Sequence, residues 1–369
     1  MEKNTNKPGK AKKILKAIGI ILLIVVLLLG GFIGYLSITE FKPADRESLT
    51  AEGEAAKTIA VGDSLHVMSW NVGYGALGDN ADFFMDGGTM VQSADEARIG
   101  ENMSAITEAI LNAEPDVLFL QETDRDSKRS EYVDEYALVR DKLNGTAMGA
   151  GYQAVFANNF KVAFLPYPVP PIGKVDSGVA TYSQYAIDSA ERVQLPVPFS
   201  WPVSMINLKR CLLVSRVKIE NSDKELVLVN LHLEAYDDGE GKLAQTKMLA
   251  ELLDAEAAKG NYVIAGGDFN QIFSSANGEK YPVYEGNWVA PEMDVTQFTG
   301  DWQFLMDEEI PSCRLLNKPY KDADKATFQY YMIDGFIVSG NLEVSAFRAI
   351  DLGFEASDHN PLVMTVTLK

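Results

Sequence analysis

A histidine beside an acid stands near the carboxyl end of the chain, in the run Ser-Asp-His-Asn-Pro at 357–361. The chain has only three histidines, so a histidine in a polar cluster is informative. A second acid, Asp334, lies upstream within a short apolar run, 332–338. A carboxylate that holds an imidazole fixes its tautomer and orientation for proton transfer. Asp334 and His359 therefore form a minimal set of groups for activating water.

Four other polar clusters stand at the ends of strand-like runs. An acid at the end of a buried strand is costly unless it is paired or bound to a metal, so Glu122 is a candidate metal ligand. Asp268 and Asn270 are two residues apart and point the same way from an extended backbone. Each cluster has a structural alternative: a turn asparagine, a surface acid or a core histidine. The clusters are Trp70-Asn71, Gln121-Glu122, Asn230-Leu231-His232 and Gly267-Asp268-Phe269-Asn270.

The elements that position these clusters are short runs rich in Val, Ile, Tyr and Phe, which favour strands. Two further segments, 97–111 and 242–258, have apolar residues at helical spacing and lead into strands. The pattern predicts a mixed α/β domain with about ten strands. The predicted strands are 66–72, 117–121, 152–157, 178–182, 211–219, 226–233, 262–266, 328–338, 344–350 and 362–368.

The amino-terminal segment differs from the rest. Residues 17–39 carry no charge and are mostly apolar, and a helix of this length spans a bilayer. Six lysines precede the segment, so the positive-inside rule places residues 1–16 in the cytoplasm and the remainder outside. A cleaved signal peptide is the alternative, although the apolar run is long for one. We expect a linker at 40–64 and one catalytic domain at 65–369.

Charge narrows the choice of partners. Residues 1–36 have a net charge of +5 and the whole chain −19, which leaves −24 on the remainder. Such an acidic protein repels nucleic acid and anionic lipid unless a cation intervenes. Clustered carboxylates are also what a hard divalent cation requires. Of the two cysteines, Cys211 lies in an apolar run, and we expect a small buried hydrophobe rather than a disulfide with Cys313.

Three loops interrupt the strands and helices. Residues 73–95 form a long loop rich in Gly and Asp, whose two adjacent phenylalanines predict packing onto the domain. Residues 166–171 and 195–202 alternate proline with apolar and aromatic residues. We expect them to fold onto the domain's own core; a wall of the site or a contact with the bilayer are the alternatives. Arg125 and Arg129 are candidates for gripping a substrate phosphate, with a solvated charge run as the alternative.

Together and in order, these clusters resemble the endonuclease/exonuclease/phosphatase superfamily of metal-dependent phosphoesterases, over about residues 65–369. The matching motifs include Asp334-Gly335-Phe336 and Ser357-Asp358-His359. The resemblance implies a four-layer α/β sandwich of two packed mixed β-sheets flanked by helices, here preceded by one transmembrane helix. The Trp-Cys-Asp-Arg signature of inositol 5-phosphatases is absent, and Ser177 stands at the strand where the family carries Gly-Asn-Ala.

The resemblance also implies roles, carried over residue by residue. A Mg²⁺ or Mn²⁺ ion is expected on Glu122 and Asp358, with Asn71 as a further ligand or a contact to the phosphate. Asp268 and Asn270 are expected to position water and phosphate oxygens. His359, oriented by Asp334, is expected to act as a base or to stabilise the transition state, and His232 to contact the phosphate.

The function predicted is that of a membrane-anchored, extracytoplasmic, Mg²⁺-dependent phosphoesterase acting on a phosphodiester, with a phospholipid or a small phosphoester favoured. An extracellular nuclease is the alternative on the same fold, disfavoured by the acidic charge. A binding ectodomain without catalysis is the alternative of another class. We infer no protein partner. The enzymatic prediction requires that the candidate side chains converge on one cleft.

Overall fold

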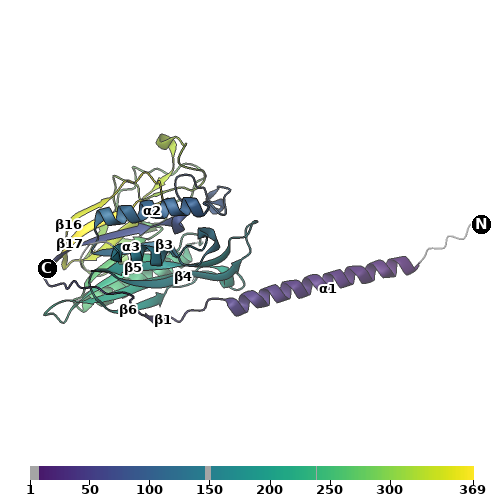
Figure 1. Ribbon diagram of the computed structural model, residues 1–369, viewed down its shortest axis with the longest axis horizontal. Coiled ribbons are helices and arrows are strands. Elements are labelled where there is room, and N and C mark those ends of the chain that lie inside the picture. The colour runs from purple at the N-terminus through teal and green to yellow at the C-terminus, as the bar shows by residue number, and fades with distance from the viewer. Residues whose placement is uncertain (1–7, 146–150, 238) are drawn as a thin grey trace, which may run out of the picture.

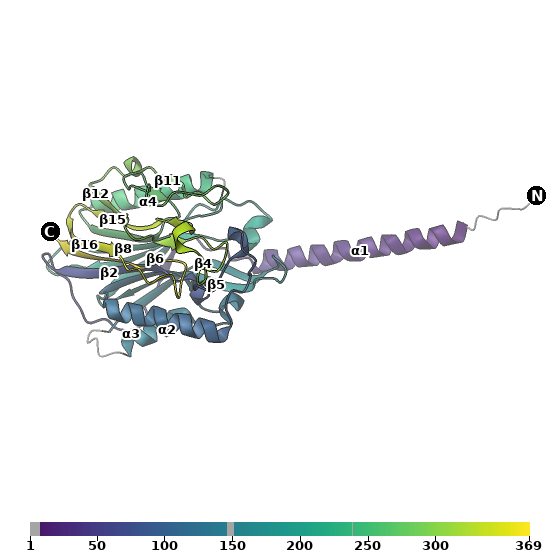
Figure 2. The ribbon, with the colours of Figure 1, turned by 90° about the horizontal axis from the view of Figure 1, so that it is seen from above.

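A computed structural model of the chain describes residues 8–145, 151–237 and 239–369. A long helix, α1 (Pro8–Thr39), extends away from a domain that holds the other elements (Figure 1). The carboxyl terminus lies at the end of the domain opposite to α1 in both views (Figures 1 and 2).

Two large mixed sheets form the centre of the domain. Strands β8 and β9 are parallel in one sheet and β2 and β3 in the other, while the remaining described strand pairs of these two sheets are antiparallel. The first sheet has the order β1 (Arg46–Leu49), β6 (Ile187–Gln194), β7 (Cys211–Lys218), β8 (Glu225–His232), β9 (Tyr262–Asp268), β15 (Asp334–Ser339) and β12 (Trp302–Leu305). The second has the order β16 (Leu342–Ala349), β17 (Leu362–Leu368), β2 (Ser64–Asn71), β3 (Val117–Asp124), β5 (Gly173–Ser183) and β4 (Gln153–Leu165).

Helices cover the outer faces of the sheets. Helices α2 (Glu96–Ala113) and α3 (Glu135–Asn144) lie on one side and α4 (Glu240–Ala258) on the opposite side (Figure 2). The apolar positions expected in α2 are buried, and Asp95 caps its first turn by accepting from the Arg98 amide. The main core lies between the sheets and includes Phe119, Val155, Leu213, Ile264 and Phe336. The predicted four-layer α/β sandwich is therefore confirmed.

Several elements depart from the sequence prediction. Residues 40–64 do not form a free linker, because β1 pairs with β6 and Glu52 bridges to Ala154. Strands β6 and β12 and helix α3 were not expected. The predicted run 328–338 is divided into β14 (Tyr330–Tyr331) and β15, and β14 pairs with β13 (Cys313–Arg314). A further small ribbon joins β10 (Ile272–Phe273) to β11 (Glu292–Met293).

Within the described residues, one helix segment, Lys12–Thr39, is long and apolar enough to cross a membrane. Its most apolar window has a mean hydropathy of 2.9 and is not buried, properties that a signal sequence near an amino terminus shares. Among the described residues, the contacts between this helix and the domain come from its last turns. Phe32 packs edge-on against Phe164, with ring centroids 6.4 Å apart, and Leu36 is buried.

A polar bridge connects the two sheets inside the core. Gln121 Nε2 on β3 donates to Asn230 Oδ1 on β8 at 2.8 Å. Asn230 Nδ2 donates back to the carbonyls of Leu120 and Ala180, at 3.1 and 2.8 Å. Buried polar groups are tolerated when they are satisfied in this way. Two of the motif residues therefore hold the sheets together rather than face the site.

We expect Asn230→Ala to lower the free energy of unfolding by about 2–4 kcal/mol, because Gln121 and two carbonyls lose a buried partner. Urea denaturation of the full chain in detergent measures this change. Asn112→Ala, on the exposed face of α2, is the matched control, with an expected change within about 0.5 kcal/mol. Equal stability of the two variants would contradict the bridge.

Candidate active site

Three candidate side chains form a row across the first sheet. The register pairs His232 on β8 with Asp268 on β9, and Asp268 with Asp334 on β15. Gly267 permits this close approach: its φ is +146°, and a Cβ there would lie 1.9 Å from the Leu231 carbonyl oxygen. A side chain at 267 would therefore separate β8 from β9 where the row forms.

The second sheet supplies two more candidates from neighbouring strands. Asn71 ends β2, in register with Gln121 of β3. A bulge between Leu120 and Thr123 interrupts the pairing of β3 with β5, and Glu122 within it has φ +53°. A left-handed conformation costs a non-glycine residue about 1–2 kcal/mol. The bulge turns Glu122 into the cleft, while Gln121 keeps its bond to the other sheet.

The segment before β17 is tied to the end of β2. Ser357 Oγ donates to the Asn71 carbonyl at 2.8 Å, and Trp70 Nε1 donates to the His359 carbonyl at 2.8 Å. These bonds place Asp358 and His359 between the ends of the two sheets.

Asn71 lies at the centre of the cluster as a donor. Its Nδ2 donates to Glu122 Oε1 and to Asp268 Oδ2, both at 3.1 Å, and lies 3.5 Å from His359 Nε2. Its Oδ1 accepts from the Gly73 amide at 3.0 Å. In this placement Asn71 orients the two carboxylates, and its oxygen is not presented as a metal ligand.

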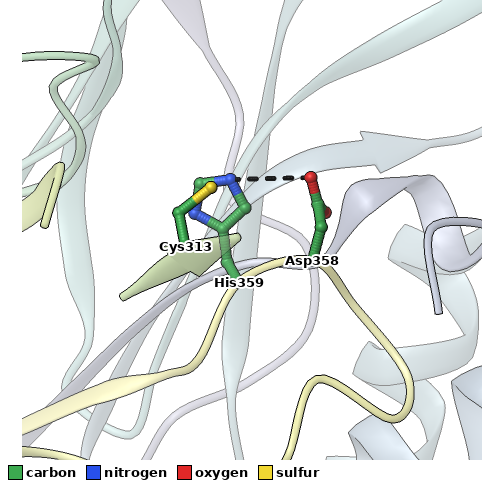
Figure 3. Close-up of side chains that lie close together, drawn as sticks. All are labelled: Cys313, Asp358 and His359. Carbon is green, nitrogen blue, oxygen red and sulfur yellow. Dashed lines mark ion pairs between the residues drawn. The ribbon is translucent and has the colours of Figure 1, made fainter. Parts of the chain in front are cut away.

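The His359 ring is oriented by Asp334 and not by its sequence neighbour. Nδ1 lies 2.8 Å from Asp334 Oδ2, whereas Nε2 lies 3.8 Å from Asp268 Oδ2 and 3.9 Å from Asp358 Oδ2. Figure 3 shows the ring between Cys313 and Asp358. Burial by itself lowers the pKa of His359, but anionic neighbours, Asp334 first, raise it well above its usual value. The Asp334 carboxylate therefore favours the imidazolium form of the His359 ring.

His232 has the opposite character. Its Nε2 lies 3.4 Å from Asp268 Oδ2 and 4.0 Å from Glu122 Oε1. Burial, followed by the charges of Arg210 and His359, holds its pKa well below the usual value. A neutral imidazole there can donate one hydrogen bond from Nε2 without adding charge.

His359 is the cationic neighbour that these carboxylates have among the described residues, and no lysine or arginine adds to it. Burial and then Asp334 raise the pKa of Asp268 to about 7. Burial, with Glu122 adding to it, raises the pKa of Asp358 to about 6. Among the described residues, no lysine or arginine forms an ion pair with Glu122, Asp268, Asp334 or Asp358. Crowded carboxylate oxygens with so little counter-charge fit a hard divalent cation.

Two compact groups could each offer ligand atoms to one ion: Asp268, Asp334 and His359, or Cys313, Asp358 and His359. Burial raises the pKa of the Cys313 thiol to about 12, and a thiol binds metal as the thiolate, so the second group is a poor site. In the first group, Asp334 and His359 already satisfy each other. Glu122 and Asp358, which face the same cleft, are the better-suited pair.

Glu122, His232, Asp268, Asn270, Asp358 and His359 line one cavity of about 590 Å³. Asn71 and Asp334 are not part of its lining, and Asp334 lies directly behind His359. Arg129 also lines it; its guanidinium binds Asp124 through Nε and Nη2 at 3.0 and 2.9 Å. Arg125 does not: it lies 3.5 Å from Asp134 and over the Tyr136 ring. A second cavity, about 680 Å³, lies between α2 and β16 and contains none of the candidate residues.

Sequence reasoning missed several residues that line the cavity. Asp86 arrives on the 73–95 loop and accepts from the Tyr236 hydroxyl at 3.2 Å; burial and then Asp358 raise its pKa to about 7. Arg210 is buried beside Glu234 at 3.7 Å. Asn159 sits at a bulge of β4, next to the strand in which the expected asparagine is missing. The Gly/Asp-rich composition of the 73–95 loop could have indicated Asp86. Asn159 could not be found in this way, because a β-bulge has no sequence signature.

Asp334→Asn is expected to lower the pKa of His359 toward its ordinary value, because the carboxylate that stabilises the imidazolium is lost. Histidine NMR titration of the full chain in detergent with chelator measures this, and three histidines give few signals to assign. The control is Asp351→Asn, an exposed acid. An unchanged His359 pKa in Asp334→Asn would contradict the proposed orientation of the pair.

The fold matches solved structures at low sequence identity. An endonuclease/exonuclease/phosphatase from Beutenbergia cavernae DSM 12333 has 19% identity and a TM-score of 0.55, covering 83% of this chain and 72% of that one. An endonuclease/exonuclease/phosphatase family protein from Leptotrichia buccalis C-1013-b has 14% identity and a TM-score of 0.53, covering 82% of this chain and 100% of that one. The human Nocturnin catalytic domain with bound sulfate has 16% identity and a TM-score of 0.51, covering 86% of this chain and 98% of that one. No curated protein matches the sequence.

The family model for the endonuclease/exonuclease/phosphatase family matches residues 68–359, which contain every candidate residue discussed above. With the four-layer fold and the convergence of these residues on one cleft, this match shows that the chain belongs to the endonuclease/exonuclease/phosphatase family and is a metal-dependent phosphoric ester hydrolase.

Proposed function

We propose that the chain is a membrane-anchored, Mg²⁺-dependent phosphodiesterase that acts outside the cytoplasm on a phospholipid or a small phosphodiester. The observation that carries the proposal is the meeting of the Asp334–His359 pair with Asp268, Asn71 and Glu122 at the ends of two sheets.

Glu122 and Asp358 would hold the cation, Mg²⁺ or Mn²⁺. When bound, the cation would neutralise charge on the phosphate and lower the pKa of a water molecule bound to it. A neighbouring side chain in the folded protein orients the carboxylates of the site. Asn71 keeps the Glu122 and Asp268 carboxylates in place through its two donated hydrogen bonds.

The protonation states suggest how the side chains divide the chemistry. Asp268, with a pKa of about 7, is suited to accept a proton from water near neutral pH. His359 as an imidazolium donates from Nε2 to a phosphate oxygen and stabilises the charge that develops there. His232 donates from Nε2 to the phosphate from the opposite side. Asn270, whose amide donates to Asp268 Oδ1 at 2.9 Å, fixes the orientation of that carboxylate. The water oxygen then bonds to phosphorus and gives its proton to Asp268, the ester P–O bond breaks, and the leaving oxygen takes a proton from solvent and departs as an alcohol.

Charge and shape support a small or lipid substrate. The net charge of −24 beyond the amino-terminal segment repels a long nucleic acid. The wall of the cleft beyond the catalytic residues is apolar and includes Phe84, Tyr167 and Phe199. Arg129, which lies against the Tyr74 ring at 3.7 Å and binds Asp124, is one of three described arginines that line the cleft and would add a cationic contact to the substrate phosphate.

We expect turnover of a phosphodiester that requires Mg²⁺ and stops on addition of EDTA. His359→Ala should lower kcat about 10²–10⁴-fold, the usual range for an acid–base group. The assay uses the full chain in detergent with bis-aryl phosphate, sphingomyelin, phosphoinositides and plasmid DNA. His66→Ala, an exposed histidine bonded to Thr365 at 3.1 Å, is the matched control. Activity that survives both EDTA and His359→Ala would overturn the mechanism; cleavage of DNA alone would favour the nuclease.

Topology is tested by labelling in intact cells. Because both native cysteines are buried, new surface cysteines can be labelled selectively. A membrane-impermeant maleimide should react with Val61→Cys and not with Thr5→Cys, if residues 1–16 are cytoplasmic. Labelling at 5, or a mature protein whose mass lacks the amino-terminal segment, would contradict the anchored topology.

A further inference from the structure

Two loops that the catalytic chemistry does not use flank the place where α1 meets the domain: residues 166–172, between β4 and β5, and residues 195–206, which end in a short 3₁₀ helix, η4 (Val203–Ile206). We propose that these two loops insert into the bilayer beside α1, so that the apolar end of the cleft receives the hydrocarbon part of a phospholipid from that bilayer. This inference rests on the proposed function and specifies its substrate class.

The first support is the position of the loops along the axis of α1. Phe164, next to the last residue of β4, packs on Phe32 of α1. Phe32 stands seven residues before the end of the helix at Thr39, which is about 10 Å along its axis. The tip of the β4–β5 hairpin therefore lies beside the apolar part of α1. The second loop is attached near the same place, where Ser37 Oγ donates to Met205 Sδ at 3.0 Å.

The second support is what the loops expose. Neither loop contains an Asp, Glu, Lys or Arg, in a chain of which 23% is charged. Val169 is 92% exposed, Tyr167 67% and Trp201 65%. The loops were expected to fold onto the core, and the structure instead places these side chains outside it. Contiguous exposed apolar groups mark an interaction surface, and Trp and Tyr favour the membrane interface.

The third support is continuity with the cleft. Residues of both loops also line its wall, namely Tyr167, Ile172, Phe199, Val203 and Ile206, and the same cavity contains His232, Asp268 and His359 at its polar part. An amphiphile entering between the loops would keep its tails on the apolar wall while its phosphate reaches the catalytic side chains. A phosphodiester in the bilayer next to α1 has this distribution of charge and apolar surface.

The bilayer contact is tested by the depth of a fluorescent label. The full chain in proteoliposomes carries a label at Val169→Cys or, as control, at Val61→Cys. Val61 is also exposed, at 53%, but its neighbour Gly62 bonds to Leu368 near the carboxyl terminus, far from α1. Lipids with nitroxides on their tails should quench the label at 169 and leave the label at 61 unchanged. Equal quenching at the two sites would overturn the proposal, as would a label at 169 shielded by a second copy or another protein.

The substrate class is tested with Val169→Ser/Trp201→Ser, which changes no cleft-lining residue. Hydrolysis of phospholipid in the same vesicles should fall about five- to tenfold, because the loops lose apolar contact with the bilayer. Hydrolysis of soluble bis-aryl phosphate should be unchanged. Equal loss of both activities, or of neither, would overturn the inference. Turnover of bis-aryl phosphate without any turnover of phospholipid by the unmodified chain would overturn it too, and would leave the proposed phosphodiesterase standing.

Discussion

The catalytic site is built from the ends of two separate sheets, so it depends on the hydrogen bonds that fix one sheet against the other. The bridge between Gln121 and Asn230 provides them beside the site. Glu122 follows the first of these residues directly, and His232 is two residues beyond the second. An apolar pair at these positions would also fill the core, but apolar contacts are not directional. The buried hydrogen bonds of Asn230 to Gln121 and to the carbonyls of Leu120 and Ala180 are directional, so they restrict the sheets to one relative position.

With the sheets fixed, the site gathers negative charge that the protein itself does not neutralise. The three described arginines that line the cleft each contact a protein group other than the site carboxylates: Arg129 binds Asp124, Arg210 lies 3.7 Å from Glu234, and Arg314 binds the carbonyls of Leu77 and Gly78. The raised pKa values of Asp268 and Asp358 express the resulting repulsion. The same crowding that is unfavourable in the isolated chain favours a divalent cation, and Asn71 limits how far Glu122 and Asp268 can move apart.

The residues of the site were largely predictable because they follow apolar runs, and strand ends of one sheet edge meet in space. Asn71, Glu122, His232 and Asp268 stand at such strand ends, whereas Asp334 and His359 were singled out as a scarce imidazole near an acid. The resemblance to the family then favoured a role in the site over the structural alternative for each residue. What the sequence does not reveal is set by local irregularity. The bulges at Glu122 and near Asn159 decide which face a side chain occupies, and neither has a sequence signature. Arg125 and Arg129 stand four residues apart in one charged run, yet only the second reaches the cleft. Strand β1 escaped detection because its four residues carry two charges and lie at the sheet edge.

The acidic charge and the apolar loops are best understood together. A surface with a net charge of −24 is repelled by anionic headgroups, so electrostatic attraction cannot hold the cleft against a membrane. In the topology proposed above, one transmembrane helix would attach the domain to the bilayer but would leave it free to tilt about the end of the helix. Contacts through Phe32 and Leu36 reduce that freedom on one side. Uncharged loops that carry Tyr167, Val169 and Trp201 add an apolar contact that charge does not oppose. Attachment, orientation and access to the cleft then arise from neighbouring parts of the chain, while the carboxylates remain free for the cation.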